Sequence, residues 1–596
     1  MKIFDIPLML FVLFRMMWFK IKSPPNQLTI GKKIGQNAKR FPNKVMMIDS
    51  NRSITWKQFN ELSNRFADLL KSKGFEKGET IAIMMANRIE FLALLTGASK
   101  VGVISGLINI TLKGKVLLDA FEAINAKYLF YGEEVTNNVN ELRKNLEKSI
   151  DQFIYIKDGE TEYCKNGDID FYSEIQNYTT NEPSHIPEID IHTPCYYIFT
   201  SGTTGKIKPI LISHLKWYRA SKAFADFALL LTKKDIMYNF LPIYHGSGLH
   251  TAFGPVVLKS ATLVLKRKFS ASDFFFDVNE NNVTCFSYIG EICRFLLNHA
   301  NKEKISVSKS LKCTGNGLQY NIWDEFKNKL NIKRICEFYA LTEGNMAFLN
   351  SFNKKETFGF SLSSFNVVQY DSNTEELARD NKNRLLNVKA YQQGMLITKI
   401  TNTDQYQFYS NNQHLKNKIL YNVFQKGDAY FLTGDIIKRV NVGFSFGLPH
   451  YQFIDRANDT YRWRGENISS SDTASVIAKH SFIKDVIVFG VKIPNIEGKA
   501  GMAVIEAVKK DFDLGRFSEY LYKSMSKEAI PLFLRLVNRI EKTSTHKNKK
   551  SAYQNEGYNI NKVSDSLFVL NLLTKSYKAL DNSMYEKIIS GKYNEF

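Results

Sequence analysis

Residues 196–213, YYIFTSGTTGKIKPILIS, place hydroxyl and ammonium side chains around two glycines, between two apolar runs. Gly202 and Gly205 allow positive φ angles, so several backbone N–H groups can turn toward one concavity. The polar side chains of this loop are Thr200, Ser201, Thr203, Thr204, Lys206 and Lys208. Converging N–H, O–H and ammonium groups favour the binding of a polyphosphate.

The loop is not a Walker A loop, which needs G-x-x-x-x-G-K-[ST] followed by a helix. Here the glycines are three positions apart, and Ile207 follows the first lysine. The apolar, β-branched run at 210–212 predicts a second strand, so the expected layout is strand, loop, strand. The structural alternative is a Gly/Ser/Thr turn in a hairpin.

Two further motifs contain residues suited to catalysis. Leu241–His250, LPIYHGSGLH, puts His245 just after an apolar run, although a lone histidine is most often part of the core. Glu337–Met346, EFYALTEGNM, sets Tyr339, Thr342 and Glu343 beyond a predicted strand end, where α/β sheets place ligand sites. A carboxylate near a polyphosphate is a natural Mg²⁺ ligand, and the alternative is a Thr-Glu pair that starts a helix.

Two motifs in the last third of the chain are turn-like. Tyr430–Ile436, YFLTGDI, is predicted to end a β run at Gly434-Asp435, where the aspartate could bind ribose hydroxyls or simply form a β-turn. Phe453–Ser469, FIDRANDTYRWRGENIS, is charged and then resumes helical periodicity, which suits a domain boundary.

The elements around these motifs predict an α/β fold. Residues 80–109 read as strand, helix and strand, a βαβ unit, and strands are expected at 127–131 and 152–156. An amphipathic helix is expected within 53–75, with Phe59, Leu62, Phe66, Leu69 and Leu70 on one face. Residues 133–150 and 157–192 are polar and are expected to be mainly loops.

Length and composition indicate a globular chain of two or more domains. With 596 residues the chain exceeds one core, and its net charge of +21 suits an anionic partner such as ATP, CoA or anionic lipid. No nucleic-acid motif is present, and a lysine-rich surface is the plain alternative. The six cysteines form no CxxC pair, which favours buried, reduced thiols.

The N-terminus is apolar. Phe4–Phe19, FDIPLMLFVLFRMMWF, is interrupted by Asp5 and Arg15 and ends before Pro24. As a helix it spans roughly 24 Å, less than a hydrocarbon core of about 30 Å. We expect a membrane anchor or an interfacial helix, with a buried terminal helix as the alternative. If this helix spans the membrane, Lys20 and Lys22 would keep the following domain on the cytosolic side.

The order of these motifs resembles the adenylate-forming superfamily, whose signatures are a phosphate loop, Y-H, Y-x-x-T-E, T-G-D and a hinge D-R. Within it, four stretches resemble the fatty acid transport protein and very long-chain acyl-CoA synthetase family: YIGEICRFL, TGNGLQYNIWDEF, EFYALTEGN and DTYRWRGENIS. The resemblance runs from about residue 28 to the C-terminus. It implies an anchor at 1–27, an AMP-binding domain at 28–455, built of α/β sheets with a barrel-like subdomain, and a small, mobile α+β lid domain at 456–596.

The resemblance also implies roles for individual residues. The loop Thr200–Gly205 with Lys208 would enclose the β- and γ-phosphates of ATP. Tyr339 would stack on adenine, with Gly315, Asn316 and Gly317 walling the same pocket. The remaining implied contacts are Thr342 to the α-phosphate, Glu343 to Mg²⁺, Asp435 and Arg456 to the ribose, His245 at the mouth of the acyl tunnel, and Gly465 among the cofactor contacts.

The C-terminal segment offers three lysines for one role. The family's T-G-T-x-K segment corresponds to KTSTHKNKK, Lys542–Lys550, with Ser544 for glycine. Lys547 aligns with the lysine that promotes adenylation, while Lys549 and Lys550 are close enough to compete for the role. Other departures are Ile207 for the loop proline, the incomplete turn in AYQQGMLI, a longer stretch between Asp435 and Asp455, and Ile530 for an arginine.

The resemblance implies an ATP-dependent ligase that joins a long- or very long-chain fatty acid to CoA through an acyl-adenylate, coupled to fatty acid uptake. Two alternatives stay open: a transport or binding protein with impaired catalysis, and an adenylate-former with another acid. Endoplasmic reticulum, plasma membrane and peroxisome all fit, and neither acyl chain length nor oligomeric state follows from the sequence.

Overall fold

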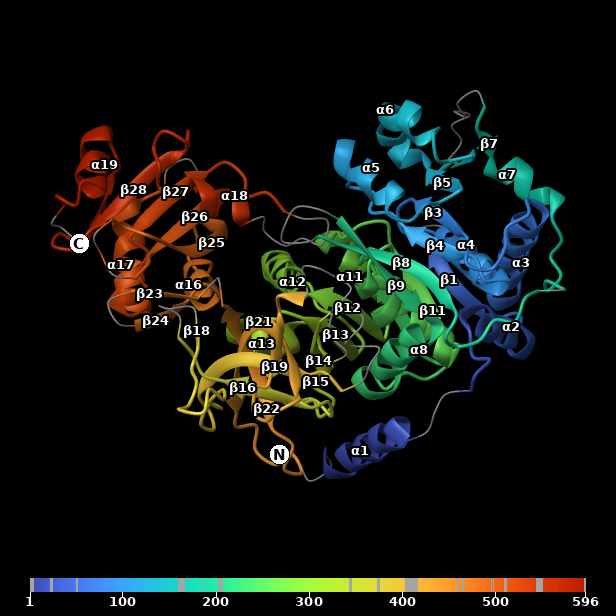
Figure 1. Ribbon diagram of the computed structural model, residues 1–596, viewed down its shortest axis with the longest axis horizontal. Coiled ribbons are helices and arrows are strands. Elements are labelled where there is room, and N and C mark those ends of the chain that lie inside the picture. The colour runs from blue at the N-terminus through green and yellow to red at the C-terminus, as the bar shows by residue number, and fades with distance from the viewer. Residues whose placement is uncertain are drawn as a thin grey trace. The chain divides into compact units, whose positions relative to one another are not determined.

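The chain folds into two compact units, coloured blue to green and mainly yellow to red in Figure 1. Unit 1 comprises Met1–Leu318, Asp324–Cys336 and Ser351–Asn353, and unit 2 comprises Gln319–Trp323, Glu337–Asn350 and Lys354–Phe596. The computed structural model describes residues 5–21, 25–49, 52–158, 167–184, 186–201, 207–341, 346–371, 376–401, 416–457, 460–463, 466–494, 496, 498–508, 512–542 and 550–593.

One sheet of unit 1 has seven strands in the order β7-β6-β5-β3-β4-β8-β9. All neighbours are parallel except the β8–β9 hairpin. The strands are β3 Thr80–Met84, β4 Ile104–Leu107, β5 Tyr128–Gly132, β6 Gln152–Ile156, β7 Ile169–Asp170, β8 Pro194–Ser201 and β9 Ile207–Ser213. The predicted βαβ unit is therefore confirmed, with α4 (Ile89–Val101) as its helix.

The second sheet of unit 1 follows the order β14-β13-β12-β10-β11-β1-β2. Its strands are β1 Val45–Asp49, β2 Arg52–Thr55, β10 Ile236–Asn239, β11 Thr262–Leu265, β12 Cys285–Ile289, β13 Leu311–Asn316 and β14 Ile332–Ala340. Strand β14 begins in unit 1 and ends in unit 2, where β15 (Ala347–Leu349) pairs with its last residues.

Helices surround these sheets. The predicted amphipathic helix is α3 (Trp56–Ser72), which buries Phe59, Phe66, Leu69 and Leu70. Other helices of unit 1 include α2 Ile30–Arg40, α5 Gly114–Glu122, α6 Thr136–Leu146, α7 Phe171–Glu174, α8 His214–Ala223, α10 Gly254–Lys259, α11 Ala271–Glu280 and α12 Gly290–Lys302. The prediction of loop for 133–150 is wrong, because α6 occupies most of that range.

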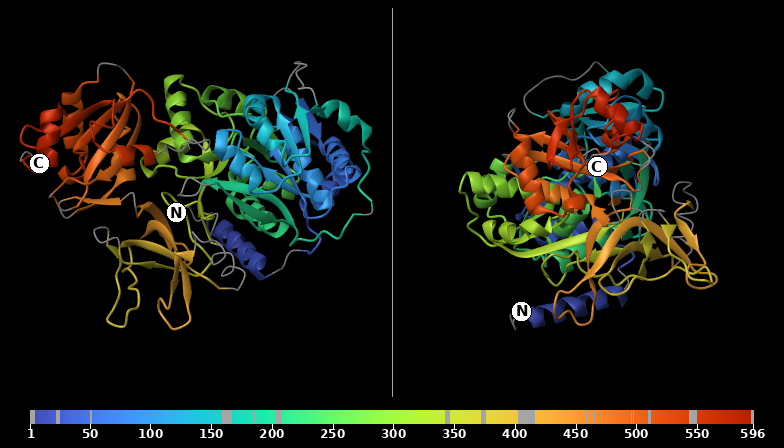
Figure 2. Two further views of the ribbon diagram at one scale, coloured as in Figure 1. Left: turned by 45° about the horizontal axis from the view of Figure 1, so that its top comes forward. Right: turned by 90° about the vertical axis from the view of Figure 1, so that its left-hand side faces the viewer.

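Helix α1 (Asp5–Ile21) is the predicted N-terminal helix, visible in dark blue in Figure 2. Arg15 lies 2.6 Å from the carboxylate of Asp226, which is only 1% exposed in the π-helix η3 (Phe224–Ala228). The helix buries Met9, Val12 and Met16, and it exposes Leu8, Leu10, Phe11, Phe14 and Met17. None of the helices in the described part of the chain is both long and apolar enough to cross a membrane.

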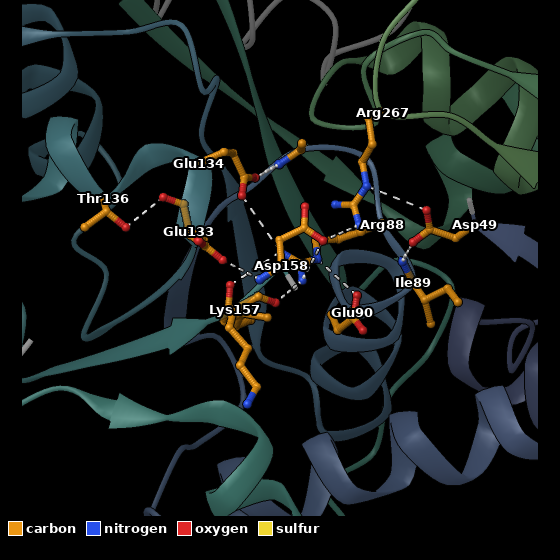
Figure 3. A network of polar contacts seen from close by, with 12 residues as sticks. Asp49, Arg88, Ile89, Glu90, Glu133, Glu134, Thr136, Lys157, Asp158 and Arg267 are labelled. Carbon is orange, nitrogen blue, oxygen red and sulfur yellow. Dashed lines mark hydrogen bonds and ion pairs between the residues drawn. The ribbon is translucent and has the colours of Figure 1, made fainter. Parts of the chain in front are cut away.

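A buried polar network joins the two sheets of unit 1 (Figure 3). Arg88, 1% exposed after β3, donates to Glu90 at 3.1 Å and to the carbonyls of Ile156 and Lys157 beyond β6. From the other sheet, Asp49 accepts the N–H of Ile89 at 3.3 Å. Although the carboxyl ends of parallel strands often bind ligands, the protein's own charges fill this one.

Unit 2 contains two five-stranded sheets in addition to smaller two-stranded ones. The first consists of β16 Phe365–Val368, β19 Gln393–Lys399, β20 Ile419–Tyr421, β21 Ala429–Val440 and β22 His450–Arg456. The second consists of β25 Ile483–Val491, β26 Ala500–Ala507, β27 Phe533–Val537, β28 Ser566–Asn571 and β29 Ser576–Ala579. Residues from Tyr461 to Ile588 form a core of their own around this second sheet, with helices α16 Ser470–Ile477, α17 Leu514–Ser524, α18 Ser551–Glu556 and α19 Asn582–Ile589.

The thiols agree with the sequence-based expectation. Within the described residues, the thiols of Cys195, Cys285, Cys293, Cys313 and Cys336 are buried, whereas Cys164 lies outside them. The boundary expected between residues 455 and 456 stays a prediction.

Candidate active site

The glycine-rich loop lies between two paired strands, as predicted. Strands β8 and β9 are antiparallel, and Thr200 pairs with Lys208 at the loop end of the hairpin. The loop therefore leaves the sheet at its edge, since β9 is the outermost strand. Residues Gly202, Thr203, Thr204, Gly205 and Lys206 lie outside the described residues.

His245 occupies a structural position in unit 1. Its Nδ1 accepts the N–H of Ser247 at 3.2 Å, so the imidazole caps the short helix α9 (Gly246–Gly248). Helix α9 runs directly into a π-helix, η4 (Leu249–Phe253), and then into α10. This geometry supports the structural alternative and does not test the expected place at an acyl tunnel.

The Gly315–Asn316–Gly317 segment ends strand β13 in close contact with the start of α12. A Cβ on Gly290 would lie 1.7 Å from the carbonyl oxygen of Gly317, and one on Gly315 would lie 2.4 Å from the ring of Tyr288. Gly317 itself has φ +87°, which favours glycine. Only residues without side chains fit at these positions, and the sequence alone assigned no role to Gly290.

Unit 2 brings Tyr339, Asp435 and Arg456 together. Strand β14 carries Tyr339, whose O–H donates to the carboxylate of Asp435 in β21. The neighbouring strand β22 places Arg456 directly opposite Asp435, with Nε 3.5 Å from Oδ1. Asp435 is only 6% exposed, whereas Arg456 is 67% exposed.

The electrostatics of this trio follow from burial. Burial and the adjacent Asp435 carboxylate raise the pKa of Tyr339 well above its usual value, so the phenol stays protonated and able to donate. The ring of Tyr339 stacks on Phe358 at 5.4 Å and meets Phe348 edge-on at 5.9 Å. These two phenylalanines are support residues that sequence reasoning missed, because nothing in their own motif marks them.

Two details of the sequence-based prediction are wrong. Tyr339 does not lie beyond a strand end, because β14 continues to Ala340. Asp435 does not end a β run, because β21 continues to Val440 and Gly434 takes φ +82° within it. Strand β21 continues beyond Gly434 because it pairs with β19 and with β22. The register shift between β21 and β19 marks a bulge, and a bulge changes the direction in which nearby side chains point, including that of Asp435.

The remaining predicted residues are Thr342, Glu343, Gly465 and Lys547, which lie outside the described residues. Within the described part of the chain, no group of three or more His, Cys, Asp or Glu side chains could hold a metal ion. The candidate residues of unit 2 therefore form a cluster, whereas those described in unit 1 lie on separate elements.

Comparisons with known proteins identify the family. The family model described as "AMP-binding enzyme" matches residues 34–383. The medium/long-chain-fatty-acid–CoA ligase FadD6 of Mycobacterium tuberculosis is 32% identical, over 92% of this chain and 89% of its own length. Long-chain fatty acid transport protein 6 of Mus musculus is 33% identical, over 94% of this chain and 91% of its own length.

The fold agrees with these relatives. The crystal structure of the anthranilate CoA ligase AuaEII in complex with anthranoyl-AMP matches with a TM-score of 0.73, covering 89% of this chain and 98% of that one at 17% identity. Sequence, motif order and fold lead to one family. The chain belongs to the AMP-binding, adenylate-forming enzymes, among the fatty acid transport proteins and fatty-acid–CoA ligases.

Proposed function

We propose that this protein is an AMP-forming ligase that uses ATP to join a long- or very long-chain fatty acid to CoA. The observation that carries the proposal is the Tyr339–Asp435–Arg456 cluster in a chain about one third identical, along most of its length, to a fatty-acid–CoA ligase and to fatty acid transport proteins. The reaction would run through an acyl-adenylate, with coupling to fatty acid uptake.

The first half-reaction requires positive charge and alignment, because the fatty carboxylate and the triphosphate are both anionic. The loop Thr200–Gly205 and Lys208 would bind the β- and γ-phosphates, and Thr342 the α-phosphate. Glu343 would hold Mg²⁺, which neutralises phosphate charge when it is bound. A single carboxylate suffices, since Mg²⁺ usually takes one or two carboxylates together with phosphate oxygens.

The nucleoside would be held by the Tyr339–Asp435–Arg456 cluster of unit 2. Tyr339 presents a ring already stacked on Phe358, and a rigid ring is suited to stacking on adenine. The Asp435 carboxylate accepts a hydrogen bond from the O–H of Tyr339, and it can accept hydrogen bonds from ribose O–H groups in the same way. Arg456 is largely exposed and would donate to the same sugar.

The second half-reaction would transfer the acyl group to the CoA thiol. We propose that residues 456–596 act as a lid that rotates about Asn458. The rotation would move Lys547 away from the active site and bring the stretch Trp463–Asn467, which contains Gly465, to the CoA channel. Strands β23 (Thr460–Trp463) and β24 (Glu466–Ser469) form a hairpin that ends in this stretch, and the hairpin would present it as a unit. Hinged closure of this kind gates many enzymes.

We also propose that α1 attaches the protein to a membrane by lying in the lipid interface on the cytosolic side. Phe11 and Phe14 are 51% and 66% exposed, which is costly in water and favourable among lipid headgroups. The ion pair between Arg15 and Asp226 holds the helix against the rest of unit 1, and the Arg15 guanidinium also lies 5.2 Å from the centre of the Phe11 ring. The organelle stays open.

The direct test is formation of acyl-CoA from palmitate and from a very long-chain acid by the detergent-solubilised full-length protein, with ATP, Mg²⁺ and CoA. We expect a thioester product that requires ATP, with pyrophosphate exchange that requires the fatty acid. ATP binding without exchange would instead favour a transport or binding protein with impaired catalysis. Exchange with an aromatic acid alone would reassign the substrate.

A further inference from the structure

A tyrosine and a histidine form a hydrogen-bonded pair beside the glycine-rich loop. Tyr196 lies on β8, four residues before Thr200, and is fully buried. Its hydroxyl is 2.6 Å from Nε2 of His250 in the π-helix η4. Single π-turns within α-helices are rare and are frequent at functional sites. Both residues lie at the ends of stretches quoted above, but the family resemblance assigns a role to neither of them.

The pair has one tautomer. Among the described residues, His250 is the hydrogen-bond partner of the buried Tyr196 hydroxyl, so the hydroxyl proton must go to Nε2 or remain unpaired. Nε2 is therefore the acceptor, and in a neutral imidazole the proton must then sit on Nδ1. Burial and the neighbouring His245 lower the pKa of His250 to about 4, so the ring is neutral at physiological pH.

The Nδ1–H group of His250 lies beside Gly246, which has no side chain. A Cβ built on Gly246 would lie 3.3 Å from this nitrogen and 3.7 Å from the Cδ1 atom of the buried Ile198. No described residue accepts the Nδ1 proton, and the imidazole is partly exposed. The donor therefore lies near the buried side chain of Ile198, and a polar group placed beside apolar side chains is typical of a site that orients a mostly apolar ligand.

We propose that His250 donates a hydrogen bond to an oxygen on the chain of the fatty acid, and that the protein therefore selects hydroxy or oxo fatty acids over unsubstituted ones. This inference rests on the proposed function. The reacting carboxylate must approach the phosphates held beyond Ser201, whereas Tyr196 lies about 13 Å back along the strand from Thr200. The oxygen that meets His250 is accordingly placed on the chain rather than on the carboxyl group.

The selectivity has a simple physical cause. An unsubstituted chain would cover the Nδ1–H group without accepting its proton, and an unpaired buried donor costs about 1–3 kcal/mol. A hydroxyl or keto oxygen at the right carbon removes this cost. Sites built to hydrogen-bond a substrate reject analogues that lack the partner group.

The test compares palmitate with hexadecanoic acids that carry a hydroxyl near the carboxyl group, at mid-chain or at the terminal carbon. We expect one position to give a kcat/KM about tenfold above palmitate, and this ratio to fall toward one in His250→Phe. His250→Gln, which keeps an amide donor, should retain part of the preference. His299→Phe is a control, because it removes an imidazole of α12 that stacks on Phe275 of α11. This variant should leave the ratio unchanged.

Equilibrium binding of the same acids, measured by calorimetry without ATP, separates this inference from the proposed function. Absence of turnover with every acid would reject the ligase, while the binding ratio still tests His250. The inference is overturned if no hydroxy acid binds more tightly than palmitate. It is also overturned if His250→Phe and His250→Gln weaken palmitate and hydroxy acids equally, which is the result expected of a purely structural pair.

Discussion

The phenol O–H of Tyr339 donates a hydrogen bond to the carboxylate of Asp435, which lies 96 residues later in the chain. This contact joins the end of β14 to the bulge in β21, and Arg456 faces the same carboxylate from β22. Tyr339 therefore fixes the position of the Asp435 carboxylate, which is proposed to bind the ribose. The same tyrosine is proposed to stack on the base of the nucleotide.

Replacement of Asp435 by asparagine should raise the KM for ATP. A hydrogen bond to a charged group contributes about 1.5–3 kcal/mol, so we expect an increase of about 10- to 100-fold. Pyrophosphate exchange with palmitate measures it. Asp380→Asn is a matched control, because Asp380 pairs with Arg384 in a surface turn of unit 2. An unchanged KM in Asp435→Asn would remove the ribose role.

A second prediction concerns the lysine of the first half-reaction. Lys547→Ala should slow adenylation on the order of 10²–10³-fold, as does the loss of a group that stabilises the transition state. Lys549→Ala and Lys550→Ala are the controls within the same segment, and a larger effect in either would move the role to that residue. Equal loss of thioester formation from preformed acyl-AMP in Lys547→Ala would contradict the rotation of the lid.

Gly290→Ala should damage the Gly315–Gly317 segment. The new methyl group would lie 1.7 Å from the carbonyl oxygen of Gly317, a backbone atom that cannot rotate away. Overpacking of this kind costs about 1–3 kcal/mol, and we expect weaker ATP binding together with a lower unfolding midpoint. Calorimetry with ATP and thermal unfolding measure the two effects, and unchanged ATP affinity would show that the segment does not contact the nucleotide.

The sequence predicted the βαβ unit, α3 and the strand–loop–strand layout correctly because their apolar residues recur at the period of each element. It missed α6 for a physical reason. Val139 and Leu146 are buried, but between them the apolar face is completed by Arg143, whose guanidinium lies 3.6 Å over the ring of Phe153. An arginine that packs through its stem and its planar head is invisible to a hydrophobic pattern.

The sequence likewise predicted some features of the candidate site and missed others. Motif spacing found Tyr339, Asp435 and Arg456, but it placed the first two at strand ends, because a glycine and a polar residue usually mark a turn. Their place inside strands depends on pairing with β15, β19 and β22, which are tertiary partners. The Tyr196–His250 pair has no sequence signature, since it depends on a π-turn of η4.

A fourth prediction tests the role of α1. Replacement of Phe11 and Phe14 by serine should reduce binding to vesicles of anionic lipid at least tenfold, because burying each phenylalanine contributes about 1.5–3 kcal/mol. Co-sedimentation measures it. Leu573→Ser is the control, since Leu573 is 82% exposed elsewhere on the protein. If the serine variants sediment with vesicles as the unaltered protein does, α1 does not contact lipid.

The last prediction concerns acid stability and the network of Figure 3. Burial alone would raise the pKa of Glu90, but the hydrogen bond from Arg52 and the charges of Arg88 and Arg52 outweigh burial and lower it from 4.5 to about 2. A carboxyl group whose pKa is lower in the folded state stabilises the fold above its unfolded pKa. That contribution is lost as the pH falls from about 4.5 toward about 2.

Glu90→Gln removes this titration, so its unfolding midpoint should fall less steeply than that of the unaltered protein across the same pH range. At neutral pH the variant should already be less stable, because Arg88, which is 1% exposed, loses its nearest counter-charge. Urea unfolding at a series of pH values gives both quantities. Parallel pH profiles for the two proteins would mean that Glu90 does not titrate in this range, and that the network is held by Asp49 and Asp158 instead.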